Sequence, residues 1–495
     1  MLLLLFSTAL FLSLFHQLYW KRRNLPPGPI PLPFIGNMLS LGKPNPGYEC
    51  FRQWTKDYGD VFTFWMGSEP YVIISSYSRL KEIFILDGDT YADKKPQKFQ
   101  ELFRGGNYGV LETNGEVWKT HRQFAQLQLK NLGLGKDLMQ QKILIEVEEM
   151  FKKYEEKLGV EQNIPKVVDQ GVANVMNQLI FGYRFDETNM EEFRRLQELI
   201  EFHNTSFSNL LMVIKVFSPS CIAKLLPGET VEEVLEKLRT DFFNFFNAQI
   251  TKHREAIDFD VEESVDYAEA YLKEQKKREL LGDFESFSNK QLSNMCLDLW
   301  FAGLSTTNTT LSWILAYSLN YPEVQEKLHE ELDRMVGSDR LVTTADKNDL
   351  PYMQAFINES QRCANIVPIN LFHMTTRDTE IAGFKVPKST GVIAQISTVM
   401  LDEEVFPEPY TFNPNRFIEN GKLKKVEELV PFSIGKRQCL GEGLARMELF
   451  LFIANFFNRY TLKPGKEGMP VIDKTLEFRV TPRSFNGVLV RRFCN

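Results

Sequence analysis

The spacing of apolar and polar residues predicts a largely helical chain with a few short strands. Three segments carry apolar residues at helical spacing with Glu and Lys on the other face, which is typical of amphipathic helices. These segments cover residues 138–158, 231–256 and 322–336. A longer helix is expected over residues 291–320, and the β-branched and aromatic runs at 61–65 and 71–75 predict strands. The expected fold class is mainly α with small β-sheets.

The first twenty residues contain no charged side chain, and about 20 helical residues are enough to span a bilayer core. Lys21, Arg22 and Arg23 follow directly, and positive flanks stay on the cytosolic side. A cleaved secretory signal is the competing interpretation, but a basic start and a small-residue cleavage site are both missing. We therefore predict a transmembrane anchor over residues 1–20, with the body of the chain in the cytosol.

A proline-rich segment separates this anchor from the rest of the chain. Residues 25–37 contain five prolines, which preclude a helix and favour a stiff extended connection. Residues 21–46 are therefore interpreted as a basic stop and a proline-rich hinge. Residues 47–495 contain no repeat and no second linker, and are expected to form one large domain.

Charge and composition exclude several classes of protein. The net charge of −7 leaves no global basic footprint, so nucleic acid is not expected as a partner. Six cysteines are scattered without a CxxC pair, which argues against a disulfide scaffold or a structural zinc site and fits a reducing compartment. The 40 phenylalanines favour a large apolar interior or pocket.

One cysteine stands in a distinctive setting near the carboxyl end, in the segment PFSIGKRQCLGEG at residues 431–443. Cys439 directly precedes an expected helix over residues 440–457. Free N–H groups and the helix dipole at such a helix start stabilise a thiolate. Cys439 is therefore a candidate thiolate ligand of an iron porphyrin.

The neighbours of this cysteine fit the same interpretation. Gly435 allows the backbone to turn where a side chain would collide with the macrocycle, and Gly441 lets the helix lie against it. Phe432 can shield the sulfur, and Arg437 can pair with a propionate. The pattern Phe-x-x-Gly-x-Arg-x-Cys-x-Gly resembles the signature of the cytochrome P450 superfamily, in particular its microsomal drug- and lipid-metabolising branch. The resemblance implies a single haem domain of the P450 fold, with haem b held by Cys439.

Three further motifs resemble the same family. Glu359 and Arg362 form Glu-x-x-Arg, and their i, i+3 spacing places them on one helix face. The resemblance implies that Arg416 joins them in a structural charge cluster. Trp118 and Arg122 share a helix face at i, i+4, and the resemblance implies that both contact a haem propionate. By the same resemblance, His373 supplies another propionate donor.

The oxygen-binding segment of the family resembles residues 302–307, within the long helix expected over 291–320. Gly303 would remove a side chain where oxygen must fit, and Thr306 would offer a hydroxyl that helps protonate bound dioxygen. Ser305 stands where most members carry Asp or Glu directly before the threonine. The resemblance therefore implies oxygen activation at Thr306, while the proton path is left open by Ser305.

The resemblance implies a monooxygenase that inserts one atom of O2 into a hydrophobic small molecule, such as a xenobiotic, a fatty acid or a steroid-like compound. Electrons would come from NADPH through NADPH–cytochrome P450 reductase, with cytochrome b5 as a second candidate partner. The implied location is the endoplasmic reticulum membrane, with membrane lipid in contact with a single-pass anchor. The substrate pocket is expected to include Phe103, Phe301, Ala302, Val367 and Phe485. One alternative is a reductase-independent haem-thiolate isomerase or dehydratase acting on lipid hydroperoxides, and another is a haem binder without catalytic activity.

Overall fold

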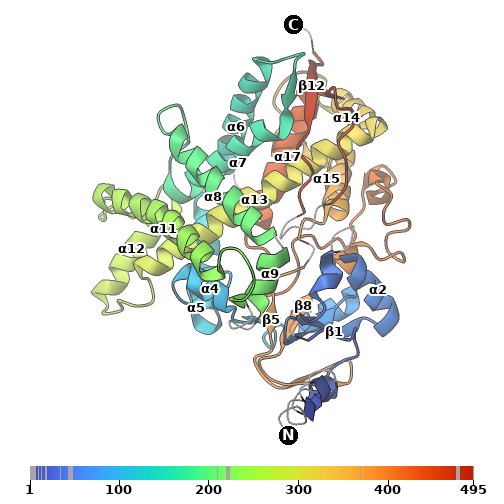
Figure 1. The fold of residues 1–495 in the computed structure, drawn as a ribbon. Coiled ribbons are helices and arrows are strands. Elements are labelled where there is room, and N and C mark those ends of the chain that lie inside the picture. The colour runs from blue at the N-terminus through green and yellow to red at the C-terminus, as the bar shows by residue number, and fades with distance from the viewer. Residues whose placement is uncertain are drawn as a thin grey trace.

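The computed structural model describes residues 7–493 apart from 9–10, 13, 17–18, 34, 43–47, 136, 209, 219–222, 368 and 475–479. Within these residues the chain is mainly helical and has four small β-sheets, which confirms the predicted fold class (Figure 1). The predicted anchor over residues 1–20 falls largely outside the described positions. Among the described residues, no helix combines the length and the apolar character needed to cross a bilayer.

The helices that the structure describes are α2 (Tyr48–Tyr58), α3 (Tyr77–Leu80), α4 (Lys98–Arg104), α5 (Gly115–Asn131), α6 (Asp137–Glu155), α7 (Ile164–Phe181), α8 (Met190–Ser208), α9 (Leu210–Phe217), α11 (Val231–Ala256), α12 (Tyr267–Leu280), α13 (Asn289–Asn320), α14 (Pro322–Met335), α15 (Pro351–Ala364), α16 (Ile396–Met400) and α17 (Glu442–Arg459). Short helical turns are η1 (Trp20–Arg22), η2 (Met38–Gly42), η3 (Lys81–Leu86), η4 (Thr344–Asp349) and η5 (Pro414–Phe417).

The strands are β1 (Val61–Met66), β2 (Glu69–Ile74), β3 (Asp93–Lys94), β4 (Glu161–Asn163), β5 (His373–Met374), β6 (Thr379–Ile381), β7 (Phe384–Val386), β8 (Gly391–Ala394), β9 (Ile418–Glu419), β10 (Lys422–Leu423), β11 (Tyr460–Pro464) and β12 (Asn486–Arg491). The largest sheet has the order β1-β2-β8-β5-β3, with β2 and β8 parallel and the other neighbours antiparallel. Its β3–β5 pairing joins Lys94 to His373 across the ladder.

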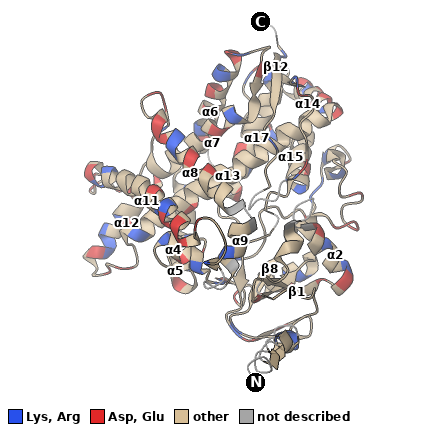
Figure 2. Ribbon diagram, in the orientation of Figure 1, with Lys and Arg blue, Asp and Glu red and all other residues tan. Residues whose placement is uncertain are grey.

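Helix α13 forms the centre of the helical body (Figure 1). It packs against α7, α11, α15 and α17, and all but a few of its side chains are buried. Charged side chains instead gather on the outer helices α11, α12 and α14, as Figure 2 shows. The predicted helix over residues 291–320 is confirmed, and it begins two residues earlier, where the Ser288 side chain accepts a hydrogen bond from Gln291 N and caps the helix.

The proline-rich segment lies beside the largest sheet. Thr63 N donates to the carbonyl oxygen of Pro27, and the Thr63 hydroxyl donates to that of Pro26, both at 2.8 Å. At Gly28, an added Cβ would lie 2.1 Å from the carbonyl oxygen of Thr63. The first half of the segment, through Pro31, is without helix as predicted and is held by close backbone contact with β1, whereas Leu32 and Gly36 close a turn by hydrogen bonds between their main chains.

The start of α15 is fixed by a buried acid from the neighbouring helix. Glu331 of α14 accepts hydrogen bonds from Tyr352 N and Met353 N, both at 2.8 Å. A carboxylate at a helix start satisfies free N–H groups and interacts favourably with the helix dipole. This contact positions the helix that carries Glu359 and Arg362.

Candidate functional site

The cysteine loop is a closed turn that ends at the start of α17. Cys439 N donates to the carbonyl oxygen of Phe432, and Gln438 N to that of Gly435, both at 3.0 Å. Desolvation raises the pKa of Cys439, while the backbone N–H of Gly441 counteracts this shift. The Cys439 residue is nevertheless exposed at the surface of its loop, so a bound group can reach the sulfur.

The two glycines of the loop, Gly435 and Gly441, have different surroundings. Gly435 has φ +83°, and an added Cβ would lie 2.1 Å from the carbonyl oxygen of Phe84. An added side chain here would collide with the backbone of η3, and the expected collision with the macrocycle stays a prediction. At Gly441, in contrast, an added Cβ would meet no described atom within 4 Å. Gly441 thus leaves an open cradle beside Cys439.

Arg437 lies flat on Trp118 and donates to main-chain oxygens. Its guanidinium carbon is 3.8 Å from the Trp118 ring centre. It donates to the carbonyl oxygens of Ala92 at 2.5 Å, Thr113 at 2.6 Å and Val110 at 3.3 Å. Burial lowers the pKa of Arg437. Its positive charge therefore lies within the protein without an ion pair to a described carboxylate.

Arg122 lies one turn after Trp118 on α5, as the i, i+4 spacing predicted. It donates to the carbonyl oxygen of Gln438 at 2.5 Å, and burial lowers its pKa. The Trp118 indole nitrogen is buried and has no hydrogen-bond partner among the described residues. A buried N–H without an acceptor costs about 1–3 kcal/mol, so this position favours an acceptor supplied by a bound group.

A buried lysine that the sequence motifs did not reveal completes this group. Lys94 is paired with His373 across β3 and β5, and its ammonium lies 3.5 Å from His373 Nε2. Burial lowers the pKa of Lys94 to about 7. His373 Nδ1 is 2.9 Å from the carbonyl oxygen of Tyr91, so Nδ1 carries the proton and Nε2 accepts. In this arrangement Lys94, and not His373, presents N–H groups to an anion.

These residues fit the carboxylates of a haem. Buried Lys94 and half-buried Arg122 and Arg437 place three basic side chains near one another, without a described carboxylate in ion-pair contact. Buried charges are costly unless they are paired, so two propionates would offset that cost. The Trp118 N–H adds a hydrogen-bond donor, Gly441 adds open space, and the Cys439 sulfur adds a soft ligand.

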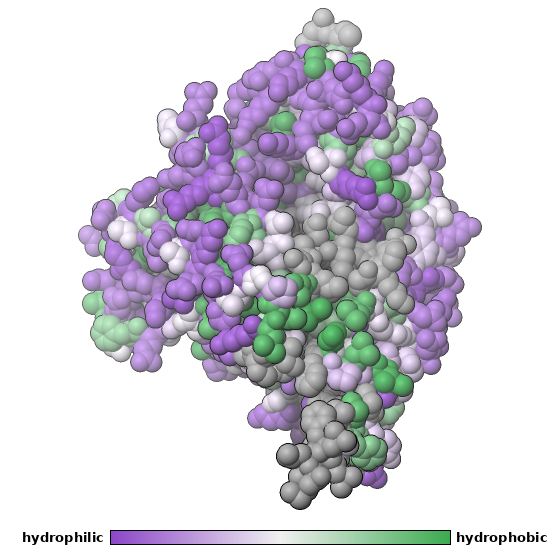
Figure 3. Space-filling model, viewed as in Figure 1, coloured by the Kyte–Doolittle hydropathy of each residue, from purple (hydrophilic) through white to green (hydrophobic). Residues whose placement is uncertain are grey.

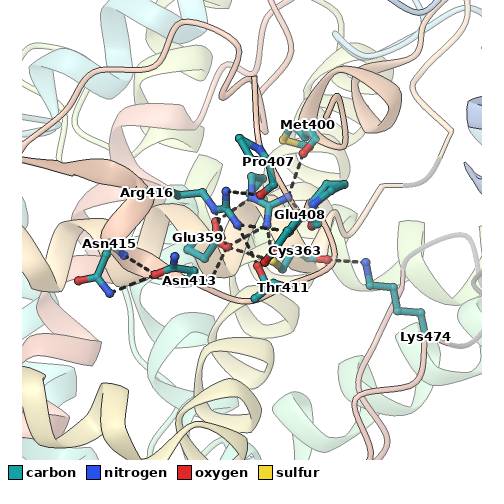
Figure 4. A network of polar contacts seen from close by, with 12 residues as sticks. Glu359, Cys363, Met400, Pro407, Glu408, Thr411, Asn413, Asn415, Arg416 and Lys474 are labelled. Atoms are coloured by element: carbon teal, nitrogen blue, oxygen red, sulfur yellow. Dashed lines mark hydrogen bonds and ion pairs between the residues drawn. The ribbon is translucent and has the colours of Figure 1, made fainter. Parts of the chain in front are cut away.

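The structure brings the predicted charge cluster together, as Figure 4 shows. Arg362 donates to both Glu359 oxygens at 2.7 and 2.8 Å, and Arg416 Nε donates to Glu359 Oε1 at 3.0 Å. Arg362 also donates to the carbonyl oxygens of Met400 and Pro409, and Arg416 to that of Pro407. Glu359 and Arg362 are fully buried. The cluster therefore ties α15 to the loop that precedes the cysteine segment.

On α13, the predicted oxygen-binding residues differ in their contacts. The Thr306 hydroxyl donates to the carbonyl oxygen of Ala302 at 2.7 Å, which leaves its lone pairs available. The Ser305 hydroxyl is buried and has no partner among the described residues. An added Cβ at Gly303 would lie 2.5 Å from Cε and Sδ of Met176 on α7. Gly303 therefore lets α7 pack closely on α13, and its role in making room for oxygen stays a prediction.

Replacing Gly303 by alanine is expected to lower stability by about 1–3 kcal/mol, because the added methyl group overpacks the α7–α13 contact. Shortening Met176 to alanine in the same chain should recover part of this loss, as expected for coupled neighbours. Denaturant unfolding of the two single variants and the double variant measures the coupling. Gly443→Ala is a matched control, since its Cβ would meet only Leu134 at 4.0 Å. If the losses in the free energy of unfolding of the two single variants simply add in the double variant, the contact between positions 303 and 176 is contradicted.

A buried acid on α17 contacts α13, and none of the sequence motifs indicated it. Glu448 of α17 is fully buried, and Thr307 donates a hydrogen bond of 3.4 Å to its Oε2. Its Oε1 has no partner among the described residues. Burial raises the pKa of Glu448 to about 8. Its position, nine residues after Cys439 on an apolar helix, is the sequence feature that could have indicated it.

The raised pKa of Glu448 predicts that the free energy of unfolding depends on pH. Between pH 4.5 and about 8, the unfolded carboxyl is ionised while the folded one keeps its proton. The folded state therefore loses stability as pH rises through this window, by up to about 1.4 kcal/mol per pH unit. Glu448→Gln should remove that slope while keeping the hydrogen bond from Thr307. Urea unfolding of both proteins at a series of pH values measures it, and parallel curves would contradict the assignment.

Two of the expected pocket residues lie around one histidine. The Phe301 ring centre is 4.9 Å from that of His203, and the Phe103 ring centre is 6.3 Å from it. Ala302 follows Phe301 and accepts from Thr306. Val367 is half-buried beyond α15 and Phe485 is buried before β12. Within the described part of the chain, no ring contact joins Phe485 to the aromatic group formed by Phe103, His203 and Phe301.

Comparison with known proteins agrees with this geometry. A family model described as Cytochrome P450 matches residues 26–486. Cytochrome P450 2J5 of Mus musculus is 34% identical over 481 residues, which cover 96% of this chain and 93% of that protein. Cytochrome P450 2J2 of Homo sapiens is 35% identical over 464 residues, covering 93% and 90%. Cytochrome P450 2B15 of Rattus norvegicus is 34% identical over 464 residues, covering 93% and 92%.

The chain therefore belongs to the cytochrome P450 family. It is a P450 monooxygenase whose cofactor is haem. The P450 fold and the haem that the sequence predicted are thereby confirmed.

Proposed function

We propose that this chain inserts one oxygen atom of O2 into a hydrophobic small molecule, with electrons from NADPH delivered by a reductase. The observation that carries this proposal is the aromatic group of Phe103, His203 and Phe301, because Phe301 and Thr306 lie on the same helix, α13. Aromatic side chains bind apolar molecules, and the Thr306 hydroxyl can hold a proton close to the carbon that reacts. Xenobiotics, fatty acids and steroid-like molecules are the candidate substrates.

We assign separate roles to the residues that would hold the haem and to those that would deliver protons. Cys439 would be the iron ligand, and Lys94, Arg122 and Arg437 with the Trp118 N–H would hold the propionates. The haem supplies the dioxygen chemistry when bound. The Thr306 hydroxyl would hold a proton at Oγ1, and the Ser305 hydroxyl, lacking a carboxylate's charge, would pass protons only through hydrogen-bonded water. We therefore expect slower proton delivery than a carboxylate at position 305 would give.

The electron partner and the membrane belong to the same proposal. Lys436 adjoins the cysteine loop and contacts Asp89, and Lys119 of α5 is half-exposed, so both are candidates for contact with an acidic reductase or cytochrome b5. Figure 3 shows hydrophobic side chains around α9, where Leu102, Val216 and Ala223 line one cavity. Lysines also line this cavity, and apolar side chains beside lysines, together with the uncharged amino terminus and the basic residues after it, support attachment to the endoplasmic reticulum membrane with the domain in the cytosol.

The test is turnover in reconstituted membranes with NADPH, reductase and isotopically labelled dioxygen. A panel of fatty acids, steroids and planar aromatics should yield at least one product that carries one labelled oxygen, and omission of reductase should abolish it. Product formed from a lipid hydroperoxide without NADPH or reductase would contradict the proposal. No described residue favours that isomerase or dehydratase chemistry.

A further inference from the structure

A charged pair lies beside the cysteine loop, at the start of α17. Arg446 Nε donates to Glu442 Oε1 at 2.8 Å, one helical turn away, and the Gln438 side chain donates to Glu442 Oε2 at 2.5 Å. The Arg446 guanidinium carbon lies 4.8 Å from the ring centre of Phe432, whose carbonyl oxygen accepts from Cys439 N. The pair is thus fixed to the loop through two of its residues, Phe432 and Gln438.

The two charges of this pair act in opposite directions on an anion at the sulfur. Desolvation is the largest cause that raises the pKa of Cys439, and the Glu442 carboxylate raises it further, while the backbone N–H groups of Gly441 and Glu442 lower it. Glu442 therefore lies within electrostatic reach of the sulfur, and its charge disfavours a thiolate there. Arg446 places the opposite charge against the same carboxylate and offsets this effect.

The pair has little else to do with charge balance or folding. Within the described part of the chain, Glu442 is the one carboxylate in ion-pair contact with Arg446. Lys347 of η4 lies within electrostatic reach of Arg446 and has the same sign, so it cannot replace the carboxylate. The side chains are 37% exposed for Arg446 and 25% exposed for Glu442, and ion pairs in contact with water contribute little to stability. Removing one charge should therefore change the field at the sulfur more than it changes folding.

We propose that the Glu442–Arg446 pair sets the reduction potential of the iron bound at Cys439. Uptake of one electron adds a negative charge at the iron and its sulfur ligand, so a positive charge nearby favours the reduced form and a negative charge disfavours it. With both charges in place, the two effects largely cancel. Both side chains act through the field at the sulfur and are positioning residues. The proposal rests on Cys439 as the iron ligand.

Single variants of the pair should shift the potential in opposite directions. Arg446→Gln leaves the Glu442 charge uncompensated and should lower the potential, and Glu442→Gln leaves the Arg446 charge and should raise it. Each change is expected to alter the equilibrium constant of one-electron reduction about three- to tenfold, and tenfold corresponds to about 59 mV. The double variant Glu442→Gln/Arg446→Gln has neither charge and should return close to the parent value.

A similar arginine at the far end of α17 provides the matched control. Arg459 donates to Glu155 from Nε at 3.0 Å and from Nη2 at 2.7 Å, and its guanidinium carbon lies 4.6 Å from the ring centre of Phe151. The helix places it about 20 Å from Arg446, which is beyond the screening length of physiological salt. Arg459→Gln loses the same kinds of contact and should keep the parent potential. Arg446→Lys retains the positive charge and should keep it as well.

Titration of the haem-loaded proteins with dithionite, in the presence of mediator dyes, measures the potential. The expected result is a pair of opposite shifts that disappear in the double variant and are smaller at high than at low salt. Shifts of the same sign in both single variants would overturn the proposal, because the pair would then act only by holding the loop in place. A double variant that differs from the parent as much as the single variants do, or no shift in any variant, would overturn it too.

The carbon-monoxide spectrum of the same samples separates this proposal from the ligand assignment on which it rests. With a red-shifted Soret band in parent and variants, thiolate ligation is intact and the potentials test the charged pair alone. A parent protein without that band would overturn both the ligand assignment and the proposal. Red-shifted spectra together with unchanged potentials would overturn the role of the pair and leave Cys439 as the ligand.

Discussion

Replacing Cys439 by serine is expected to abolish NADPH-dependent turnover, by at least about a thousandfold. A serine hydroxyl is a hard, weakly donating ligand, and it cannot supply the electron density that a thiolate gives to the iron. The rest of the site should stay in place, because the loop is closed by main-chain hydrogen bonds that do not involve the sulfur. Turnover with reductase, normalised to haem content, measures the effect.

Cys50→Ser is the matched control for this substitution. Cys50 is half-buried in α2 and belongs to no residue group of the site, so its variant should keep the parent rate. Full activity of Cys439→Ser at normal haem content would contradict the assignment of the ligand. Loss of activity together with loss of secondary structure would instead identify Cys439 as a folding residue.

Glu359→Gln is expected to be the most destabilising single change among the site residues. Glu359 is the only carboxylate in ion-pair contact with Arg362 and Arg416 among the described residues, and Arg362 is fully buried. Removing one partner of a buried ion pair typically costs about 3–5 kcal/mol, because the remaining charges are left uncompensated. Urea unfolding, followed by circular dichroism and by haem absorbance, measures the loss.

An exposed ion pair serves as the comparison for the Glu359→Gln variant. Arg340 is 46% exposed and pairs with Asp346, so Arg340→Gln should cost less than about 1 kcal/mol. If Glu359→Gln costs no more than this control, the buried cluster does not hold the cysteine loop as described. Arg416, which is 11% exposed on its side chain, should give an intermediate loss when replaced by Gln.

Local sequence patterns predicted the elements that depend on local physics. The helix over residues 231–256 was predicted from its apolar spacing with the bounds of α11, and in the structure a capping box at Thr230 fixes its start. The pairings within Trp118–Arg122 and Glu359–Arg362 also follow from helix geometry alone. Family resemblance then carried these motifs to their roles around one cysteine.

The sequence did not reveal contacts between distant segments. An added Cβ at Gly303 would meet Met176 on another helix, and a position within one helix does not reveal which residue of a neighbouring helix covers it. An added Cβ at Gly435 would meet the carbonyl oxygen of Phe84, a contact that the motif around Cys439 did not indicate. Lys94 reaches His373 only through the β3–β5 pairing, over a separation of 279 residues. Such non-local contacts have no signature in a single sequence.

The most direct test of the central claim, that Cys439 is a thiolate ligand to haem iron, is the absorption spectrum of the reduced, carbon-monoxide-bound protein. The parent chain and Cys50→Ser should both show the red-shifted Soret band that thiolate ligation produces. Cys439→Ser should bind haem and carbon monoxide without that shift. A parent spectrum without the red shift, at full haem content and native secondary structure, would contradict the assignment of Cys439.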